Sequence, residues 1–281
     1  MTDKHFVFVG GTSGIGKTAA LSLAARGARV LVLGRDAERA QRTVQQLREA
    51  GATSAEALQA DLLSRASIAA AVRGIRARSP SISGLVHSAM TVDLHARRRQ
   101  ETADGFELAY GLQYFARAAL NVALFDALAA SGDGRIVHVG AKPPTGLVPD
   151  LDDLQFERRR WTLMRALMSS QVLGFLHVQE AARRWSGAPV RIAIACVGPT
   201  VTDTIARQPW WARALYAMIA TTPERSAANV VRYLTEPDVS SQSGVAFESP
   251  KRWEARRIAY DPVLAERVWE LTTAHLPAQP S

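Results

Sequence analysis

A glycine-rich segment near the start of the chain has the spacing of a phosphate-binding turn. Four β-prone apolar residues, Phe6–Val9, run directly into it, and a helical pattern follows. Glycines let the backbone approach a phosphate, while the unpaired N–H groups and the dipole of the following helix attract its negative charge. The sequence therefore predicts a nucleotide site, whose expected contacts are Gly10, Gly11, Ser13, Gly14, Ile15 and Gly16.

The same segment fits a second nucleotide-binding motif. From Gly11 to Thr18 it matches the full Walker A pattern, G-x-x-x-x-G-K-T, of P-loop NTPases. Such an enzyme also needs an acidic residue at the end of a strongly apolar strand, because that acid holds Mg²⁺. The strongly apolar strands of this chain end in no acid, and Asp61 follows a strand rich in alanine, glutamine and glutamate. The dinucleotide interpretation is therefore favoured.

The residues after the second expected strand indicate which dinucleotide binds. Arg29–Leu33 forms that strand, and Gly34-Arg35-Asp36 follows it. An acid at this place usually holds the ribose 2′-hydroxyl of NAD, whereas an arginine accommodates the 2′-phosphate of NADP. We therefore expect NADP(H) as the cofactor, with Arg35 at the 2′-phosphate. The alternative is an exposed arginine that only opens the next helix.

Alternating strands and helices must position these groups. After the first strand–helix–strand unit, the pattern predicts a helix over Ala37–Ala50, a strand near Ala55–Ala60, a helix over 64–78 and a strand over Ile82–His87. Such alternation is typical of α/β proteins. The fold class that we expect is therefore a single Rossmann-type, doubly wound parallel sheet flanked by helices.

Composition limits the alternatives. The chain has 281 residues, of which 47% are apolar, and it shows neither a secretory signal nor an apolar run long enough to span a membrane. With Cys196 as its only cysteine, a reduced cytoplasmic protein is expected. We expect one domain over residues 1–276, a disordered tail over 277–281 and no metal site. The net charge of +8 comes from scattered arginines, so nucleic-acid binding is not expected.

Several ordered segments resemble the short-chain dehydrogenases/reductases, in particular their retinol-dehydrogenase-like and protochlorophyllide-reductase-like branch. The turn is similar to the family's TGxxxGIG motif, with Gly10 in place of Thr. The other similar segments are Thr102–Glu107 (T-x-DGFE), Gly134–Val139 (RIVNVSS), Asp153–Glu157 (DLNFE), Ser243–Phe247 (SGKYF) and Asp261–Glu270 (D-x-x-LA-x-x-LWE). The resemblance implies that Asp61 and Leu62 contact the adenine of the cofactor.

The same resemblance places four uncharged residues at the family's catalytic positions. That family uses a Tyr as general acid, a Lys that lowers the pKa of the Tyr and binds ribose, a Ser that hydrogen-bonds the substrate oxygen, and an Asn that supports a water relay. The corresponding residues here are Leu167, Gln171, Ala141 and Gln113, and no Tyr-xxx-Lys occurs in the chain. Gln171 can hydrogen-bond a ribose of the cofactor but carries no charge. General acid catalysis, worth roughly 10²- to 10⁴-fold in rate, has lost its usual donor.

Two further observations concern the expected nicotinamide end. The family's NNAG segment is His87-Ser88-Ala89-Met90 here. Ala89 is still expected to contact the cofactor, whereas Met90 in place of a Gly would crowd the cofactor channel. His87 ends a strand at the edge where ligands bind in such sheets, so it is the best candidate for a replacement proton donor. The alternative is a buried structural histidine.

A segment near residues 200–222 is expected to form a substrate lid. Its apolar and aromatic side chains favour a bulky apolar substrate, and they include Ile205, Trp210, Trp211 and Leu215. The alternative is that the segment packs on the core or on a second subunit of a homo-oligomer.

The favoured function is an NADP(H)-dependent reductase that adds hydride to a conjugated C=C or an imine, since neither reaction requires the Tyr acid. Two alternatives stay open: a non-redox biosynthetic enzyme such as a cyclase or isomerase, and a catalytically silent binding protein on the same scaffold.

Overall fold

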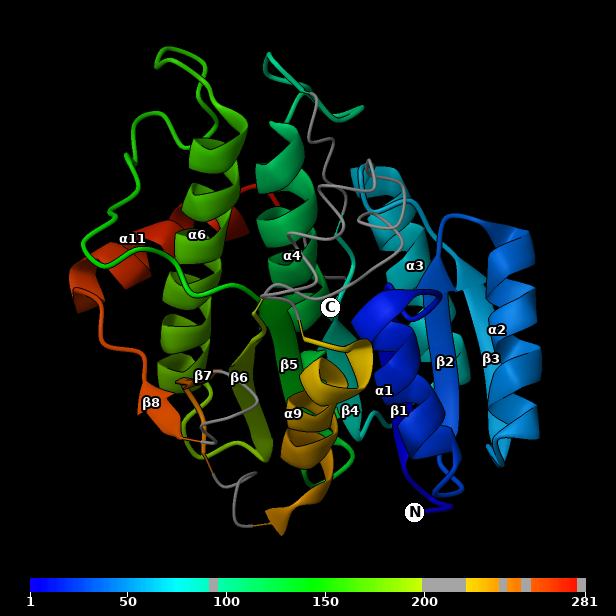
Figure 1. The fold of residues 1–281 in the computed structure, drawn as a ribbon. Coiled ribbons are helices and arrows are strands. Elements are labelled where there is room, and N and C mark those ends of the chain that lie inside the picture. Colours follow the sequence, from blue (N-terminus) through cyan, green and yellow to red (C-terminus); the bar gives the residue numbers. More distant parts are fainter. Residues whose placement is uncertain (91–95, 199–220, 238–241, 249–253, 277–281) are drawn as a thin grey trace.

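The computed structural model of the chain describes residues 1–90, 96–198, 221–237, 242–248 and 254–276 (Figure 1). Its strands are β1 (His5–Val9), β2 (Arg29–Gly34), β3 (Ser54–Gln59), β4 (Gly84–His87), β5 (Gly134–Gly140), β6 (Val190–Cys196), β7 (Val245–Glu248) and β8 (Ala255–Arg257). Its helices are α1 (Gly14–Ala24), α2 (Ala37–Glu49), α3 (Arg65–Arg78), η1 (Tyr110–Phe115), α4 (Ala116–Ala123), α5 (Phe125–Ala129), α6 (Leu163–Arg184), α9 (Pro223–Thr235) and α11 (Pro262–Thr273).

The eight strands form one sheet in the order β3-β2-β1-β4-β5-β6-β7-β8. Every neighbouring pair is parallel except β7 and β8. Val9 pairs with both Leu33 and His87, so the carboxyl ends of β2, β1 and β4 lie level at one edge. The strand order reverses between β1 and β4, and this is the point at which open α/β sheets bind their ligands. The predicted doubly wound sheet is confirmed, with an antiparallel edge strand that the sequence did not indicate.

Helices cover both faces of the sheet (Figure 1), and an apolar layer lies between the sheet and the helices on each face. Helices α1, α2 and α9 pack on one face, whereas α3, α4, α6 and α11 pack on the other. In β1, Phe6 and Phe8 belong to the first layer, and Val7 and Val9 belong to the second. A strand that is buried on both faces has no polar side to alternate with, which explains the continuous apolar run at the start of the chain.

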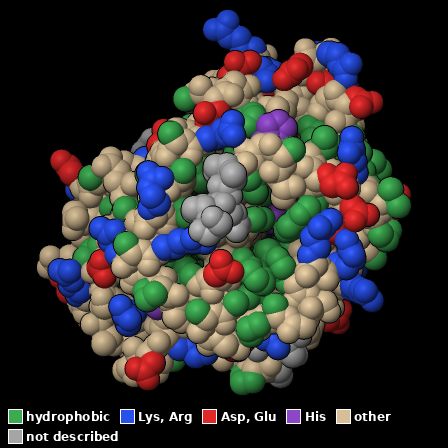
Figure 2. Space-filling view, turned by 180° about the vertical axis from the view of Figure 1, so that it is seen from behind, with side chains coloured by type: hydrophobic (Ala, Val, Ile, Leu, Met, Phe, Trp, Pro, Cys, Tyr) green, Lys and Arg blue, Asp and Glu red, His purple; other side chains and the backbone are tan. Residues whose placement is uncertain are grey.

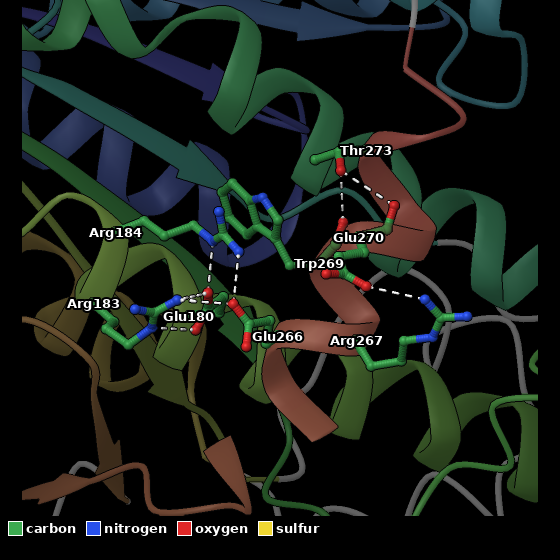
Figure 3. Close-up of polar contacts among 8 residues, drawn as sticks. All are labelled: Glu180, Arg183, Arg184, Glu266, Arg267, Trp269, Glu270 and Thr273. Carbon is green, nitrogen blue, oxygen red and sulfur yellow. Dashed lines mark hydrogen bonds and ion pairs between the residues drawn. The ribbon is translucent and has the colours of Figure 1, made fainter. Parts of the chain in front are cut away.

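A buried carboxylate fastens α11 to α6 (Figure 3). The side chain of Glu180 is 2% exposed, and it accepts hydrogen bonds from Arg183 Nε at 2.8 Å and Arg184 Nε at 2.6 Å. The Nη2 atoms of both arginines also lie 3.4 Å from Glu266 Oε1 on α11. Burial alone would raise the pKa of Glu180, but the hydrogen bonds from the two arginines outweigh it and hold the pKa below its ordinary value. Helix α6, which carries two residues of the candidate site, is thereby held against α11.

Two expected segments lie outside the described residues. These are the lid, apart from its last two residues, with Ile205, Trp210, Trp211 and Leu215, and the tail over 277–281. Among the described helices, none has the length and apolar character that a membrane crossing requires.

Candidate active site

The glycine-rich turn packs directly on the end of β4. Gly10 has a φ of +92°, and a Cβ built on it would lie 2.4 Å from the backbone nitrogen of Ala89. A Cβ on Gly16 would lie 2.0 Å from Ser88 Oγ, which donates a hydrogen bond to the carbonyl of Gly10 at 3.0 Å. Because these positions leave no room for a side chain, bare backbone faces the switch point of the sheet. This is the surface that a phosphate needs for close approach.

Helix α1 begins without a side-chain cap. In α2, α3 and α6, the Asp36, Ser64 and Thr162 side chains accept a hydrogen bond from the backbone N–H three residues on. Ser13 occupies the equivalent place before α1, but its side chain makes no such bond. The N–H groups in the first turn of α1, which starts at Gly14, therefore remain available to an anion.

The residues expected on the adenosine side lie at the same edge of the sheet. Arg35 and Asp61 are exposed at the ends of β2 and β3. Gln59 Nε2 donates to the Arg35 carbonyl at 2.9 Å, which ties these two strand ends together. The Asp61 carboxylate accepts the N–H of Leu63 at 3.0 Å, and Leu62 between them is buried. Together with the glycine-rich turn, these residues line one side of the switch point.

Three of the four residues matched to the family's catalytic positions are joined by hydrogen bonds. Gln171 Oε1 accepts the N–H of Ala141 at 3.0 Å, and Gln171 Nε2 donates to Gln113 Oε1 at 2.9 Å. A backbone N–H can only donate, so Gln171 must present its oxygen to Ala141 and its NH₂ group to Gln113. Gln113 is 2% exposed, and its own Nε2 has no partner among the described residues.

The fourth of these residues, Leu167, lies one helical turn before Gln171 on α6. It packs beside Ala109 and Phe156, and its carbonyl accepts a hydrogen bond from Ser170 Oγ at 2.8 Å. The fold thus gathers all four positions, although they come from η1, from α6 and from the residue after β5. None of the four side chains can supply a proton near neutral pH.

Gln113 lies in a π-helical turn, η1, that the sequence analysis did not anticipate. The buried Glu107 carboxylate accepts the N–H of Tyr110 at 2.8 Å and the indole N–H of Trp161 at 3.1 Å. These bonds tie the start of the turn to the segment before α6. π-helical turns are rare in proteins as a whole, and those that occur are often found at functional sites.

His87 ends β4, as expected, but it is 0% exposed. Its Nε2 lies 2.8 Å from Asn121 Oδ1, and Asn121 Nδ2 lies 2.8 Å from His138 Nε2 and 3.1 Å from His177 Nε2. The two hydrogens of the Asn121 amide can serve two ring nitrogens, so His87 donates while the other two rings accept. To act as a proton donor, His87 would have to give up the Nε2 proton that it donates to Asn121 Oδ1. The role of His87 as a proton donor stays a prediction.

Burial lowers the pKa values of these three histidines. The pKa of His87 and of His177 falls to about 3, and that of His138 lies well below its ordinary value of 6.5. The charge of nearby Arg117 adds to the effect at His87 and His138. All three rings are therefore neutral near pH 7. Among the described residues, no group of three or more His, Cys, Asp and Glu side chains is arranged to hold a metal ion.

Arg117 is the part of the site that the sequence analysis missed. Its side chain is 6% exposed and donates to the carbonyls of Val139 at 2.8 Å and Ala89 at 3.3 Å. Burial lowers its pKa to about 10, so the guanidinium remains charged at neutral pH. The only feature of the sequence that could have indicated Arg117 is its position four residues after Gln113. Such spacing cannot reveal that a charged side chain points inward.

The surface seen from behind carries charges of both signs (Figure 2). Basic and acidic side chains are interspersed over this face, and hydrophobic side chains gather near its centre. On the described part of this face there is no continuous basic field of the kind that nucleic-acid binding requires.

Comparisons with known proteins agree with the fold and with the glycine-rich turn. A family model for short chain dehydrogenases matches residues 4–145. Retinol dehydrogenase 14 of Mus musculus is 27% identical over 290 residues, covering 97% of this chain and 85% of that protein. Polyprenol dehydrogenase of Mus musculus is 28% identical over 274 residues, covering 94% and 81%. The solved Pseudomonas aeruginosa RhlG/NADP active-site complex is similar in fold, with a TM-score of 0.65, 20% identity and coverage of 83% and 90%.

Proposed function

Since the chain belongs to the short-chain dehydrogenase/reductase family, in its retinol-dehydrogenase-like branch, we propose that it is an NADP(H)-dependent reductase that works without a tyrosine acid. The observation that carries this proposal is the hydrogen-bonded chain of Gln113, Gln171 and Ala141. The residues at the catalytic positions come together, but none of them can exchange a proton. An assembled site without an acid favours a reaction that needs no acid at the reacting atom.

The residues present fit a nicotinamide dinucleotide. The bare backbone at Gly10 and Gly16 and the uncapped start of α1 would hold the pyrophosphate. Arg35 would pair with the 2′-phosphate, and Asp61 with Leu62 would border the adenine. Bound in this way, the cofactor supplies the hydride. Gln171 keeps one amide hydrogen for a ribose hydroxyl, because it gives only one to Gln113.

The substrate class follows from the missing donors. Hydride addition to a simple ketone creates an alkoxide, which needs a hydrogen-bond donor and a proton at its oxygen. Leu167 and Ala141 offer neither from their side chains. Hydride addition to an iminium gives a neutral amine, whereas addition to a conjugated C=C gives an enolate that water can protonate later. We therefore propose a bulky apolar substrate with a conjugated C=C or an imine.

The test is oxidation of NADPH by the purified protein with a panel of enones, imines and simple ketones. We expect turnover with enones or imines and very slow turnover with ketones. Gly10→Ala is the control, because its Cβ would meet backbone atoms of Ala89, which would force the glycine-rich turn to shift and should weaken cofactor binding. Bound NADPH without oxidation by any member of the panel would contradict the proposal and favour a silent binding protein.

One observation favours a non-redox enzyme as the second candidate. The side chain of Met90 is 62% exposed next to Ala89, where it would narrow the space for a nicotinamide. A cyclase or isomerase would use the pocket for orientation and burial only. Conversion of a panel substrate to an isomer in the absence of NADPH would support this candidate.

A further inference from the structure

A full positive charge is buried beneath the candidate site. Arg117 donates to the carbonyls of Val139 and Ala89, which lie at the carboxyl ends of β5 and β4. Its Nε has no partner, and within the described part of the chain no carboxylate forms an ion pair with its guanidinium. Carbonyl dipoles alone therefore compensate the charge. Burying a charge without an opposite partner is costly, so the protein gains nothing in stability from this arrangement.

The surroundings of Arg117 place the charge under one half of the expected cofactor. This step rests on the proposed function. The adenosine-side residues lie at β2 and β3, so the nicotinamide must extend across the switch point over β4 and β5. Arg117 bonds the ends of these two strands. Arg117 also lies one helical turn after Gln113, and its acceptor Val139 precedes Ala141 by two residues. Its anchoring points are therefore next to two members of the hydrogen-bonded amide chain.

We propose that Arg117 on α4 supplies the positive charge of this site, since Gln171 on α6 is neutral. This charge favours ligands that carry or develop negative charge. The oxidised nicotinamide ring is a cation and the reduced ring is neutral. A fixed cation below the ring therefore weakens binding of NADP⁺ relative to NADPH.

The same charge narrows the substrate class. It opposes an iminium ion, which is a cation before the reaction. It favours a conjugated carbonyl compound, in which hydride adds to the β-carbon and the C=C electrons move toward the carbonyl oxygen to give an enolate. Water would then protonate the α-carbon and leave hydroxide, and a bound NADPH would have supplied the hydride. Of the two proposed classes, the site thus favours enones over imines.

The closing experiment measures the dissociation constants of NADPH and NADP⁺ for the wild type, Arg117→Lys and Arg117→Met by calorimetry. The two nucleotides differ in the ring charge, so their ratio is insensitive to a general loosening of the site. We expect the wild type to bind NADPH about tenfold more tightly than NADP⁺. Arg117→Lys should keep that ratio, and Arg117→Met should bring it close to one.

The outcomes separate this inference from the function on which it rests. Equal wild-type affinity for the two nucleotides would overturn the inference and leave a cofactor-binding reductase intact. This wild-type measurement decides the matter even where Arg117→Met fails to fold. An unchanged ratio of the NADPH and NADP⁺ dissociation constants in folded Arg117→Met would also overturn the inference. Binding of neither nucleotide would remove the proposed function and the inference together.

Discussion

Acid should unfold this protein well above the pH at which carboxylates are protonated. Burial is the largest cause that lowers the pKa of His5 to about 4, of His87 and His177 to about 3, and of His138 well below 6.5. In the unfolded chain these rings regain a pKa near 6.5. Below pH 6.5 the unfolded state therefore binds protons that the folded state excludes. Stability is fully present above pH 6.5 and is lost as the pH falls toward the folded pKa values.

The magnitude is comparable to the whole stability of a domain. Each pH unit between the two pKa values of one histidine is worth ~1.4 kcal/mol. At pH 5 His5, His87 and His177 therefore cost about 2 kcal/mol each, and together they cost roughly 6 kcal/mol, to which His138 adds in the same direction. Typical domains are stable by roughly 5–15 kcal/mol. Glu180 and Asp153 also have lowered pKa values, but from ordinary values of 4.5 and 3.8, so their contribution is lost at lower pH.

The assay is urea unfolding followed by circular dichroism at several pH values between 7.5 and 5. We expect the free energy of unfolding to fall by at least about 6 kcal/mol from pH 7 to pH 5, with a limiting slope of at least about three protons. His177→Gln should lower that slope by one proton, because a glutamine oxygen can still accept from Asn121. His275→Gln, which changes an exposed histidine, is the matched control. A free energy of unfolding that stays constant over this range would refute the reasoning, because the buried rings would then take up protons in the folded state as they do in the unfolded chain.

Three further changes test the site and its support. Wild type should bind NADPH more tightly than NADH, and Arg35→Ala should abolish the difference in titration calorimetry; equal wild-type affinities would remove the argument from Arg35. Four reversions to the family's residues are combined: Gln113→Asn, Ala141→Ser, Leu167→Tyr and Gln171→Lys. Together they should restore some ketone reduction, while single reversions should do little. Failure in a folded, NADPH-binding variant would favour the non-redox candidate. Glu180→Gln should destabilise the fold by about 1–2 kcal/mol in urea, because Arg183 and Arg184 lose their shared acceptor; an unchanged midpoint would mean that water replaces those bonds at no cost.

The architecture could be predicted because its determinants are local. A strand buried on both faces has to be apolar throughout, and the run Phe6–Val9 before the glycines shows this in the sequence alone. Gly10 and Gly16 allow only a tight turn that packs on β4. The start of the helix predicted over 64–78 was also visible, since Ser64 caps α3 by accepting a hydrogen bond from the N–H of Ser67. By contrast, the three-residue antiparallel strand β8 carries no periodicity that a sequence pattern can detect.

The chemistry of the site depends on contacts between distant parts of the chain. Gln171 meets Gln113 across 58 positions, and Asn121 meets His177 across 56, because α6 packs against η1 and α4 on one face of the sheet. The sequence shows that no Tyr-xxx-Lys occurs, and the resemblance predicts that the family's Tyr, Lys, Ser and Asn are replaced, because both are matters of residue identity. It cannot show that Arg117 points inward. Whether a charged side chain is buried depends on the carbonyls that strands β4 and β5 place around it, and those strands meet only in the folded protein.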